Sequence, residues 1–185
     1  MSVPDFAPLP DADWPQALDD LRTGFAGQLN VYRIMAHHPA LLRAWTGLRT
    51  HIVQNTSLGP QRAEVVILRL AHRVGCAYEW NQHVVRGLAA GLDKGRIAAL
   101  RGPLPQMPPE DATLAGAVDA LVDNKQLNPA QLDDVVALVG KHGALDLMAT
   151  AGMYLTLGFM LNTAPPALEP AIARKLAQQA PELAA

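Results

Sequence analysis

The sequence predicts an all-α protein of about seven to nine helices, and three observations lead to this fold class. Half of the 185 residues are apolar and only 17% are charged, which is the composition of a globular chain with a sizeable core. No proline occurs in residues 61–102, and only Pro129 occurs in residues 110–164, so long stretches are free to form helices. Within these stretches, apolar residues recur at spacings of three and four.

Each expected helix has a start signal or an apolar period. Apolar residues at helical spacing are Leu41, Leu42, Trp45, Leu48 and Ile52 after Pro39, then Ala63, Val66, Ile67 and Leu70 after Pro60, then Leu114, Val118, Leu121 and Val122. Asn128 and Pro129 are expected as the N-cap and the first residue of a further helix. The run 65–68 alone would also suit a buried strand, but the neighbouring helical patterns favour a helix. Gly143 is expected to separate two helices.

Proline-rich segments divide the chain. Prolines at positions 4, 8, 10 and 15 predict an extended N-terminal arm over residues 1–14, followed by a single all-α domain over residues 15–185. Prolines at 103, 105, 108 and 109 mark a central linker, and those at 165, 166 and 170 end the last long helix.

Charge and composition disfavour several classes of protein. With 15 Lys/Arg against 17 Asp/Glu, the chain lacks the basic excess of a nucleic-acid-binding protein. One cysteine forms no internal disulfide, and the N-terminus has no basic region followed by an apolar stretch, so we expect a cytoplasmic protein. The apolar segment 147–161 has about 15 residues against the ~20 that a membrane span needs, which indicates a buried helix and no membrane contact.

The densest cluster of ionisable residues lies between Glu64 and His83. Gly75 is expected to break the helix, which places Cys76 at the start of the next one, where the helix dipole lowers the pKa of a thiol. Glu79 and His83 are four residues apart and share a helix face with Cys76. A carboxylate beside an imidazole is a proton-transfer pair. Glu64 joins this face if the two helices form a hairpin.

The segment from about residue 38 to residue 102 resembles the carboxymuconolactone decarboxylase family, which includes the alkylhydroperoxidase D-type peroxidases. The resemblance is carried by Glu64, eleven further residues, Cys76-Ala77-Tyr78-Glu79, three residues and His83, followed by Gly87, Gly91 and the stretch 97–100. It implies an alkylhydroperoxidase D-like helical bundle with its core at about 38–102, no tightly bound cofactor, and a homo-oligomer, either a trimer or a hexamer.

In the peroxidase branch, the resemblance implies a Cys-x-x-Cys pair with Glu64 and His83 as a proton relay. Cys76 matches the first cysteine and Glu79 stands at the second. Because no other cysteine exists, a dithiol cycle within one subunit is excluded. Our first hypothesis is therefore a single-cysteine peroxidase, in which Cys76 forms a sulfenic acid that an external thiol reductant resolves.

The decarboxylase branch suggests the main alternative. Its Glu-x-x-x-His arrangement resembles Glu79 and His83, which would act as the acid–base pair of a lyase or isomerase on a carboxylated lactone or small keto acid. A second alternative is a non-catalytic oligomer that binds a small ligand.

Plainer interpretations stay open beside these hypotheses. Cys76 alone suits a small buried hydrophobe, Glu79 with His83 suits a surface pair, and Glu64 suits a first-turn glutamate. Tyr78 and Trp80 are candidate walls of a substrate pocket or packing residues. A zinc site built from His72, Cys76, Glu79 and His83 needs an uninterrupted helix, which Gly75 opposes together with the charges of Arg69 and Arg73. No metal is expected.

Overall fold

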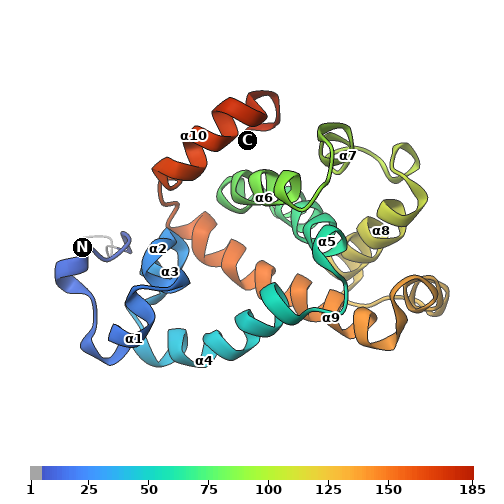
Figure 1. Cartoon of the computed structure of the whole chain (residues 1–185). Helices are drawn as coiled ribbons and strands as arrows, with labels where there is room; N and C mark the ends of the chain where they lie inside the picture. Colours follow the sequence, from blue (N-terminus) through green and yellow to red (C-terminus); the bar gives the residue numbers. More distant parts are fainter. Residues whose placement is uncertain (1–5) are drawn as a thin grey trace.

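A computed structural model describes residues 6–185, so the first five residues of the expected N-terminal arm lie outside the described residues. The chain is all-α as predicted, and residues 6–185 contain no β-strand (Figure 1). The helices are α1 (Asp19–Arg22), α2 (Phe25–Gln28), α3 (Asn30–Met35), α4 (Pro39–Thr50), α5 (Pro60–Arg73), α6 (Ala77–Ala89), α7 (Lys94–Ala99), α8 (Pro109–Asn124), α9 (Pro129–Thr163) and α10 (Pro170–Gln179). A π-helical turn covers His51–Asn55.

The ten α-helices of the described chain exceed the expected seven to nine because the segment 19–35 is divided. Extended backbone at Gly24 (φ −92°, ψ −159°) and at Leu29 (φ −114°, ψ 127°) separates three short helices there. Within the described part of the arm, Asp11–Asp13 form a 3-10 turn and Trp14 is buried.

Proline and asparagine begin the long helices, as predicted for Pro39, Pro60, Asn128 and Pro129. Pro109, which the sequence pattern assigned to a central linker, is instead the first residue of α8. Pro39, Pro60, Pro109 and Pro129 occupy the first positions of α4, α5, α8 and α9, where the missing N–H removes no helical hydrogen bond. Before α9, the Asn128 side chain accepts from the backbone N–H of Gln131 at 2.9 Å, and the Gln131 side chain accepts from the N–H of Asn128 at 3.0 Å.

Helix α9 is interrupted at Gly140, whereas the sequence pattern favoured Gly143. Gly140 has φ 71° and ψ 174°, a conformation that L side chains rarely adopt. Gly143 remains helical, and a Cβ atom there would lie 2.6 Å from the Cβ of Val139. Gly140 therefore provides the break, and Gly143 provides the space that the side chain of Val139 occupies.

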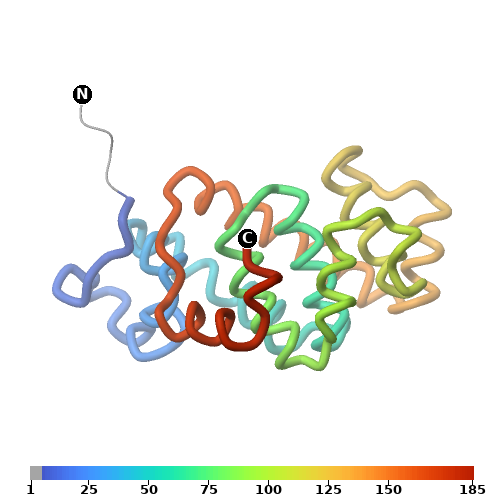
Figure 2. Tube along the Cα trace, turned by 90° about the horizontal axis from the view of Figure 1, so that it is seen from above, coloured from blue at the N-terminus to red at the C-terminus, as the bar shows by residue number. Residues whose placement is uncertain are grey.

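Helix α5 is the centre of the molecule. Its residues 65–68 and 70 are all at most 4% exposed, and it packs against α6, α8 and α9. In Figure 1, α5 and α6 lie next to each other above α9, with α8 beside α5, and Figure 2 shows the same elements from above. A helix buried on nearly all sides is typical of a protein core, so the run 65–68 is a core helix and no strand.

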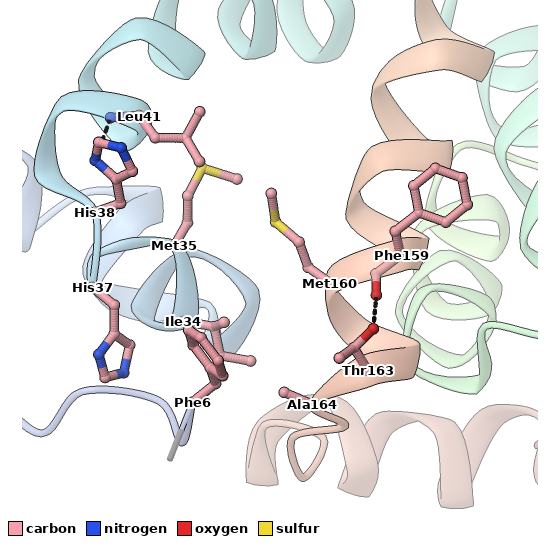
Figure 3. A pocket seen from close by; sticks show the side chains of 10 residues that line it. All are labelled: Phe6, Ile34, Met35, His37, His38, Leu41, Phe159, Met160, Thr163 and Ala164. Atoms are coloured by element: carbon pink, nitrogen blue, oxygen red, sulfur yellow. Dashed lines mark hydrogen bonds between the residues drawn. The ribbon is translucent and has the colours of Figure 1, made fainter. Parts of the chain in front are cut away.

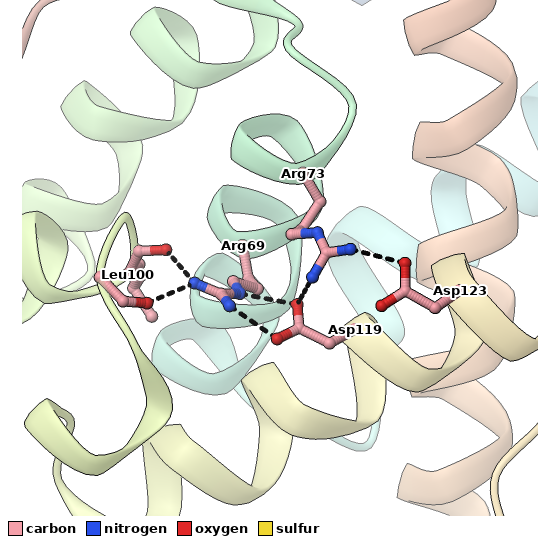
Figure 4. A network of polar contacts seen from close by, with 6 residues as sticks. Arg69, Arg73, Leu100, Asp119 and Asp123 are labelled. Atoms are coloured by element: carbon pink, nitrogen blue, oxygen red, sulfur yellow. Dashed lines mark hydrogen bonds and ion pairs between the residues drawn. The ribbon is translucent and has the colours of Figure 1, made fainter.

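Ion pairs fix α5 against α8 (Figure 4). Arg69 is 6% exposed and binds both carboxylate oxygens of Asp119, at 2.8 and 2.6 Å, and the carbonyl oxygens of Leu100 and Gly102. Arg73 pairs with Asp119 at 3.2 Å and with Asp123 at 2.6 Å. Buried guanidinium groups are tolerated when their donors are satisfied, so these contacts hold the carboxyl-terminal end of α5 in place.

Helix α9 is the one helix of the described chain that is long and apolar enough to cross a membrane. Over its most apolar window, 56% of the residues are buried inside the protein, and the helix is interrupted at Gly140. These features are typical of the core helix of a soluble protein.

Candidate active site

A tight turn at Gly75 joins α5 to α6. Gly75 has φ 63°, and Cys76 is the N-cap of α6, which confirms the predicted break. The N–H of Cys76 donates to the carbonyl oxygen of Ala71 at 2.9 Å. Because α5 and α6 pack against each other after this turn, side chains from the two helices meet.

The hairpin places His83 between two carboxylates. His83 Nδ1 lies 2.6 Å from Glu64 Oε2 on α5, and His83 Nε2 lies 3.4 Å from Glu79 Oε2 on its own helix. The side chains of His83, Glu79 and Glu64 are 3%, 6% and 13% exposed. The structure therefore brings three of the four predicted catalytic residues together in a cluster that is largely shielded from solvent.

The two carboxylates favour the charged form of His83. Burial lowers the pKa of His83, but the charge of Glu64, together with hydrogen bonding to Glu64 and Glu79, outweighs burial and raises this pKa above its usual value. The ring of Tyr154 meets the imidazole edge to face, with 5.0 Å between centroids. Burial, and secondly the charge of Glu79, raise the pKa of Tyr154 well above its usual value, so this phenol stays neutral.

Two cavities border His83. The larger, of about 170 Å³, is lined by Glu64, His83, Arg86 and Tyr154, and by apolar side chains of α5 and of the segment before it. The smaller, of about 20 Å³, has room for about one water molecule. Its lining includes Glu79 and Gln82, whose buried Oε1 atoms have no hydrogen-bond partner in the described chain.

Cys76 lies in a different environment, although it is on the same helix. It is 2% exposed and borders two other cavities, one of about 420 Å³ beside Leu161 and Pro165 and one of about 150 Å³. Its sulfur accepts from the backbone N–H of Glu79, but within residues 6–185 no side-chain hydrogen bond joins it to Glu64, Glu79 or His83.

The thiol of Cys76 also differs from expectation in its acidity. Burial raises its pKa to about 11, and the charge of Glu79 acts in the same direction. The backbone N–H groups of Glu79 and Tyr78 at the helix start lower this pKa, but by less. Desolvation therefore outweighs the favourable position at the helix N-terminus, and the lowered thiol pKa that the sequence suggested is not found.

The two candidate wall residues pack against the carboxyl-terminal segment. The Tyr78 hydroxyl donates to Glu169 at 2.6 Å, and Tyr78 borders both the smaller His83 cavity and the larger Cys76 cavity. The Trp80 indole N–H donates to the carbonyl oxygen of Leu183 at 2.7 Å, and the guanidinium of Arg101 lies over its ring. Trp80 borders the 150 Å³ cavity beside Cys76, so it is not part of the His83 cluster.

Arg86, Gln82 and Tyr154 are site residues that the sequence reasoning missed. Arg86 follows His83 by three residues, so helical spacing alone was a usable signal. Tyr154 comes from the apolar stretch of α9, and no local pattern pairs it with His83.

An apolar groove of about 420 Å³ lies elsewhere, between α3 and the carboxyl-terminal end of α9 (Figure 3). Its polar groups are bonded locally: His38 Nδ1 accepts from the N–H of Leu41, and the Thr163 hydroxyl donates to the carbonyl oxygen of Phe159. It offers no acid–base group comparable to the His83 cluster.

Comparison with known proteins agrees with the all-α fold. Residues 39–106 match the model of the carboxymuconolactone decarboxylase family. No curated protein sequence matches the chain. Two solved structures of the debrominase Bmp8, one without ligand and one of a cysteine-to-alanine variant in complex with 2,3,4-tribromopyrrole, are similar to this structure, each with a TM-score of 0.73 and 15% identity over 94% of this chain and 96% of theirs. At this identity, the similarity shows a common fold. The matched segment 39–106 contains all four predicted catalytic residues and is similar to the carboxymuconolactone decarboxylase family.

Proposed function

We propose that Glu64, His83 and Glu79 form the acid–base centre of a lyase or isomerase that acts on a carboxylated lactone or small keto acid. The observation that carries this proposal is the 2.6 Å contact between Glu64 and His83 at the wall of the 170 Å³ cavity. A proton shared between these two groups lies within reach of a molecule bound there, which is the geometric requirement for general acid–base catalysis.

In the decarboxylation form of this reaction, the bond to the departing carboxylate breaks and CO2 leaves. The electron pair of that bond passes into the neighbouring carbonyl group and gives an enolate, which needs a nearby positive charge or hydrogen-bond donor. The imidazolium of His83, with Glu64, delivers one proton to the enolate carbon. His83 then regains a proton from solvent, so each turnover consumes one proton. In an isomerisation, the same proton is removed at one carbon and returned at another.

The role of Glu79 follows from its position on the other side of the imidazole. Its contact with Nε2 fixes the ring while Nδ1 faces Glu64. A carboxylate on each nitrogen keeps the ring protonated before the reaction.

The test is turnover of a panel of carboxylated lactones and β-keto acids, followed by CO2 release and by product isomer. We expect His83→Gln to lower kcat by about 10²- to 10⁴-fold, the usual contribution of a general acid, and Cys76→Ser to retain most of the rate. The opposite ranking of the two variants refutes the proposal.

A thiol-dependent peroxidase activity is the second candidate. It is favoured by the position of Cys76 beside a 420 Å³ cavity and by the fold relative that was solved as a cysteine-to-alanine variant with a small ligand. In this reaction the thiolate attacks a peroxide oxygen, water or an alcohol leaves, and an external thiol reduces the sulfenic acid. The raised pKa of Cys76 opposes it. Thiol-dependent peroxide consumption that Cys76→Ser abolishes would establish this activity in place of the first.

A further inference from the structure

We propose that Arg86 binds a carboxylate of the substrate in the 170 Å³ cavity, so that the site selects a small organic anion over its neutral analogues. This inference deepens the proposed acid–base function and rests on it for the reaction, although the binding itself is tested separately. Arg86 is half-buried on α6 and lines both cavities that border His83.

The guanidinium of Arg86 has no hydrogen-bonding or ion-pair partner in the part of the chain that the structure describes. Arg62, Arg69 and Arg96, by contrast, pair with Glu110, Asp119 and Asp111. A guanidinium is always charged and offers five donors in a planar fork that matches a carboxylate. Arg86 is therefore a cation that is free to bind a ligand at the cavity wall.

Its charge reaches the reacting groups. Arg86 lines both cavities together with His83 and Tyr154, and its charge opposes the rise of the pKa of each of these two side chains. Glu64 and Glu79 would repel an incoming anion. As a positive charge on the wall of the same cavity, Arg86 offsets this repulsion.

The other residues that line the cavity indicate the polarity and size of the rest of the ligand. Apolar side chains of Ile52, Ala63 and Ile67 border the cavity, and Gln54 and Thr56 add two polar side chains to its wall. Its volume of about 170 Å³ lies below the ~300 Å³ at which pockets begin to hold drug-sized ligands. The cavity therefore suits a small molecule with an apolar body and an anionic group at one end.

The ion pair with Arg86 also distinguishes the carboxylate that leaves as CO2 from one that stays on the product. An ion pair with Arg86 stabilises a carboxylate and would disappear as that group becomes neutral CO2, so it would stabilise the ground state more than the transition state. In the decarboxylation form of the reaction, the carboxylate held by Arg86 is therefore a second carboxylate that the product retains, and in the isomerisation form one carboxylate suffices.

The experiment measures binding of levulinate, a small keto acid, and of its neutral amide to the full chain by calorimetry. We expect the wild-type protein to bind levulinate more tightly than the amide. Arg86→Gln should weaken levulinate binding at least tenfold and leave the affinity for the amide unchanged. Arg86→Lys, which keeps the charge, should retain part of the affinity. Arg174→Gln, at an exposed position on α10, is the matched control and should change neither ligand.

Several results overturn the assignment: equal affinity of the wild type for both ligands, no measurable levulinate binding, or unchanged levulinate affinity in Arg86→Gln. The variant His83→Gln separates the two proposals. If it abolishes turnover while Arg86→Gln leaves levulinate affinity unchanged, the carboxylate site is wrong and the acid–base centre stands. If His83→Gln keeps full turnover while Arg86→Gln no longer binds levulinate, the proposed acid–base role of His83 is refuted and the carboxylate site at Arg86 is supported.

Discussion

Cys76 and His83 lie two turns apart on one helix, and both are at most 2% exposed, yet their electrostatic environments differ. Burial disfavours the charged form of each group. At His83, carboxylates at 2.6 and 3.4 Å overcome this penalty and favour the imidazolium. At Cys76, the helix N-terminus is the main favourable influence, and burial prevails. A counter-charge in contact stabilises a buried ion, whereas a helix end alone does not.

The cavities follow the same division. The cavity of about 170 Å³ brings His83 together with Glu64 and the unpaired Arg86, whereas the 420 Å³ cavity at Cys76 is bordered by Leu161, Pro165 and other residues of the carboxyl-terminal part. Charged groups thus line the cavity beside His83, near the middle of α6, and are absent from the walls of the larger cavity at the start of the helix.

The largest expected effect concerns the reactivity of Cys76. Burial raises the pKa of Cys76 from 9.0 to about 11, so its thiolate fraction at pH 7.5 falls roughly 100-fold on folding. Iodoacetamide should therefore modify Cys76 slowly in buffer and rapidly in denaturing urea, with mass spectrometry as the readout. Fast modification in buffer would show that burial does not suppress the thiolate of Cys76, contrary to the contrast drawn with His83.

The second prediction concerns the Glu64–His83 contact. Glu64→Ala should lower the free energy of unfolding by about 3 kcal/mol, because it removes one partner of a buried charged pair. Glu110→Ala, which removes a partly exposed partner of Arg62, is the control and should cost about 1 kcal/mol or less. Urea denaturation compares the two, and equal losses would contradict a special role for the buried pair.

The third prediction uses pH. Since the folded pKa of His83 is raised, the stability from its charged form is fully present below the unfolded value of ~6.5 and is lost as pH rises through the folded value. The raised pKa of Cys76 has the same sign at higher pH, with stability lost between pH 9.0 and about 11. Urea midpoints across pH should lose the lower transition in His83→Gln and the upper one in Cys76→Ser. Retention of the lower transition in His83→Gln would assign it to another group.

The smallest effect is expected at the turn that begins α6. Gly75→Ala places a side chain at φ 63° and should cost about 1 kcal/mol. Gly152→Ala, at a helical position where a Cβ meets no other atom, should be neutral or stabilising. Thermal denaturation distinguishes the two variants, and a neutral Gly75→Ala would show that the turn tolerates other residues.

Much of the His83 cluster could be predicted from the sequence, because it depends on local spacing. Helix periodicity, the Gly75 break and the four-residue interval between Glu79 and His83 place these groups together once the hairpin closes. The burial of Cys76 depends on packing from residues about 85 to 92 positions away, including Leu161 and Leu168, and no local pattern reports it. Tyr154 was missed for the same reason, and Gly140 because several glycines of α9 suit a break equally well.

The most direct test of the central claim is a nitrogen-15 NMR titration of the His83 imidazole. The two carboxylates should keep both ring nitrogens of His83 protonated at pH values where an ordinary histidine, with a pKa of ~6.5, is already neutral. Glu64→Gln should shift this titration to lower pH. An imidazole that is neutral at pH 6 in the wild-type protein would contradict the assignment of His83 as a charged proton donor.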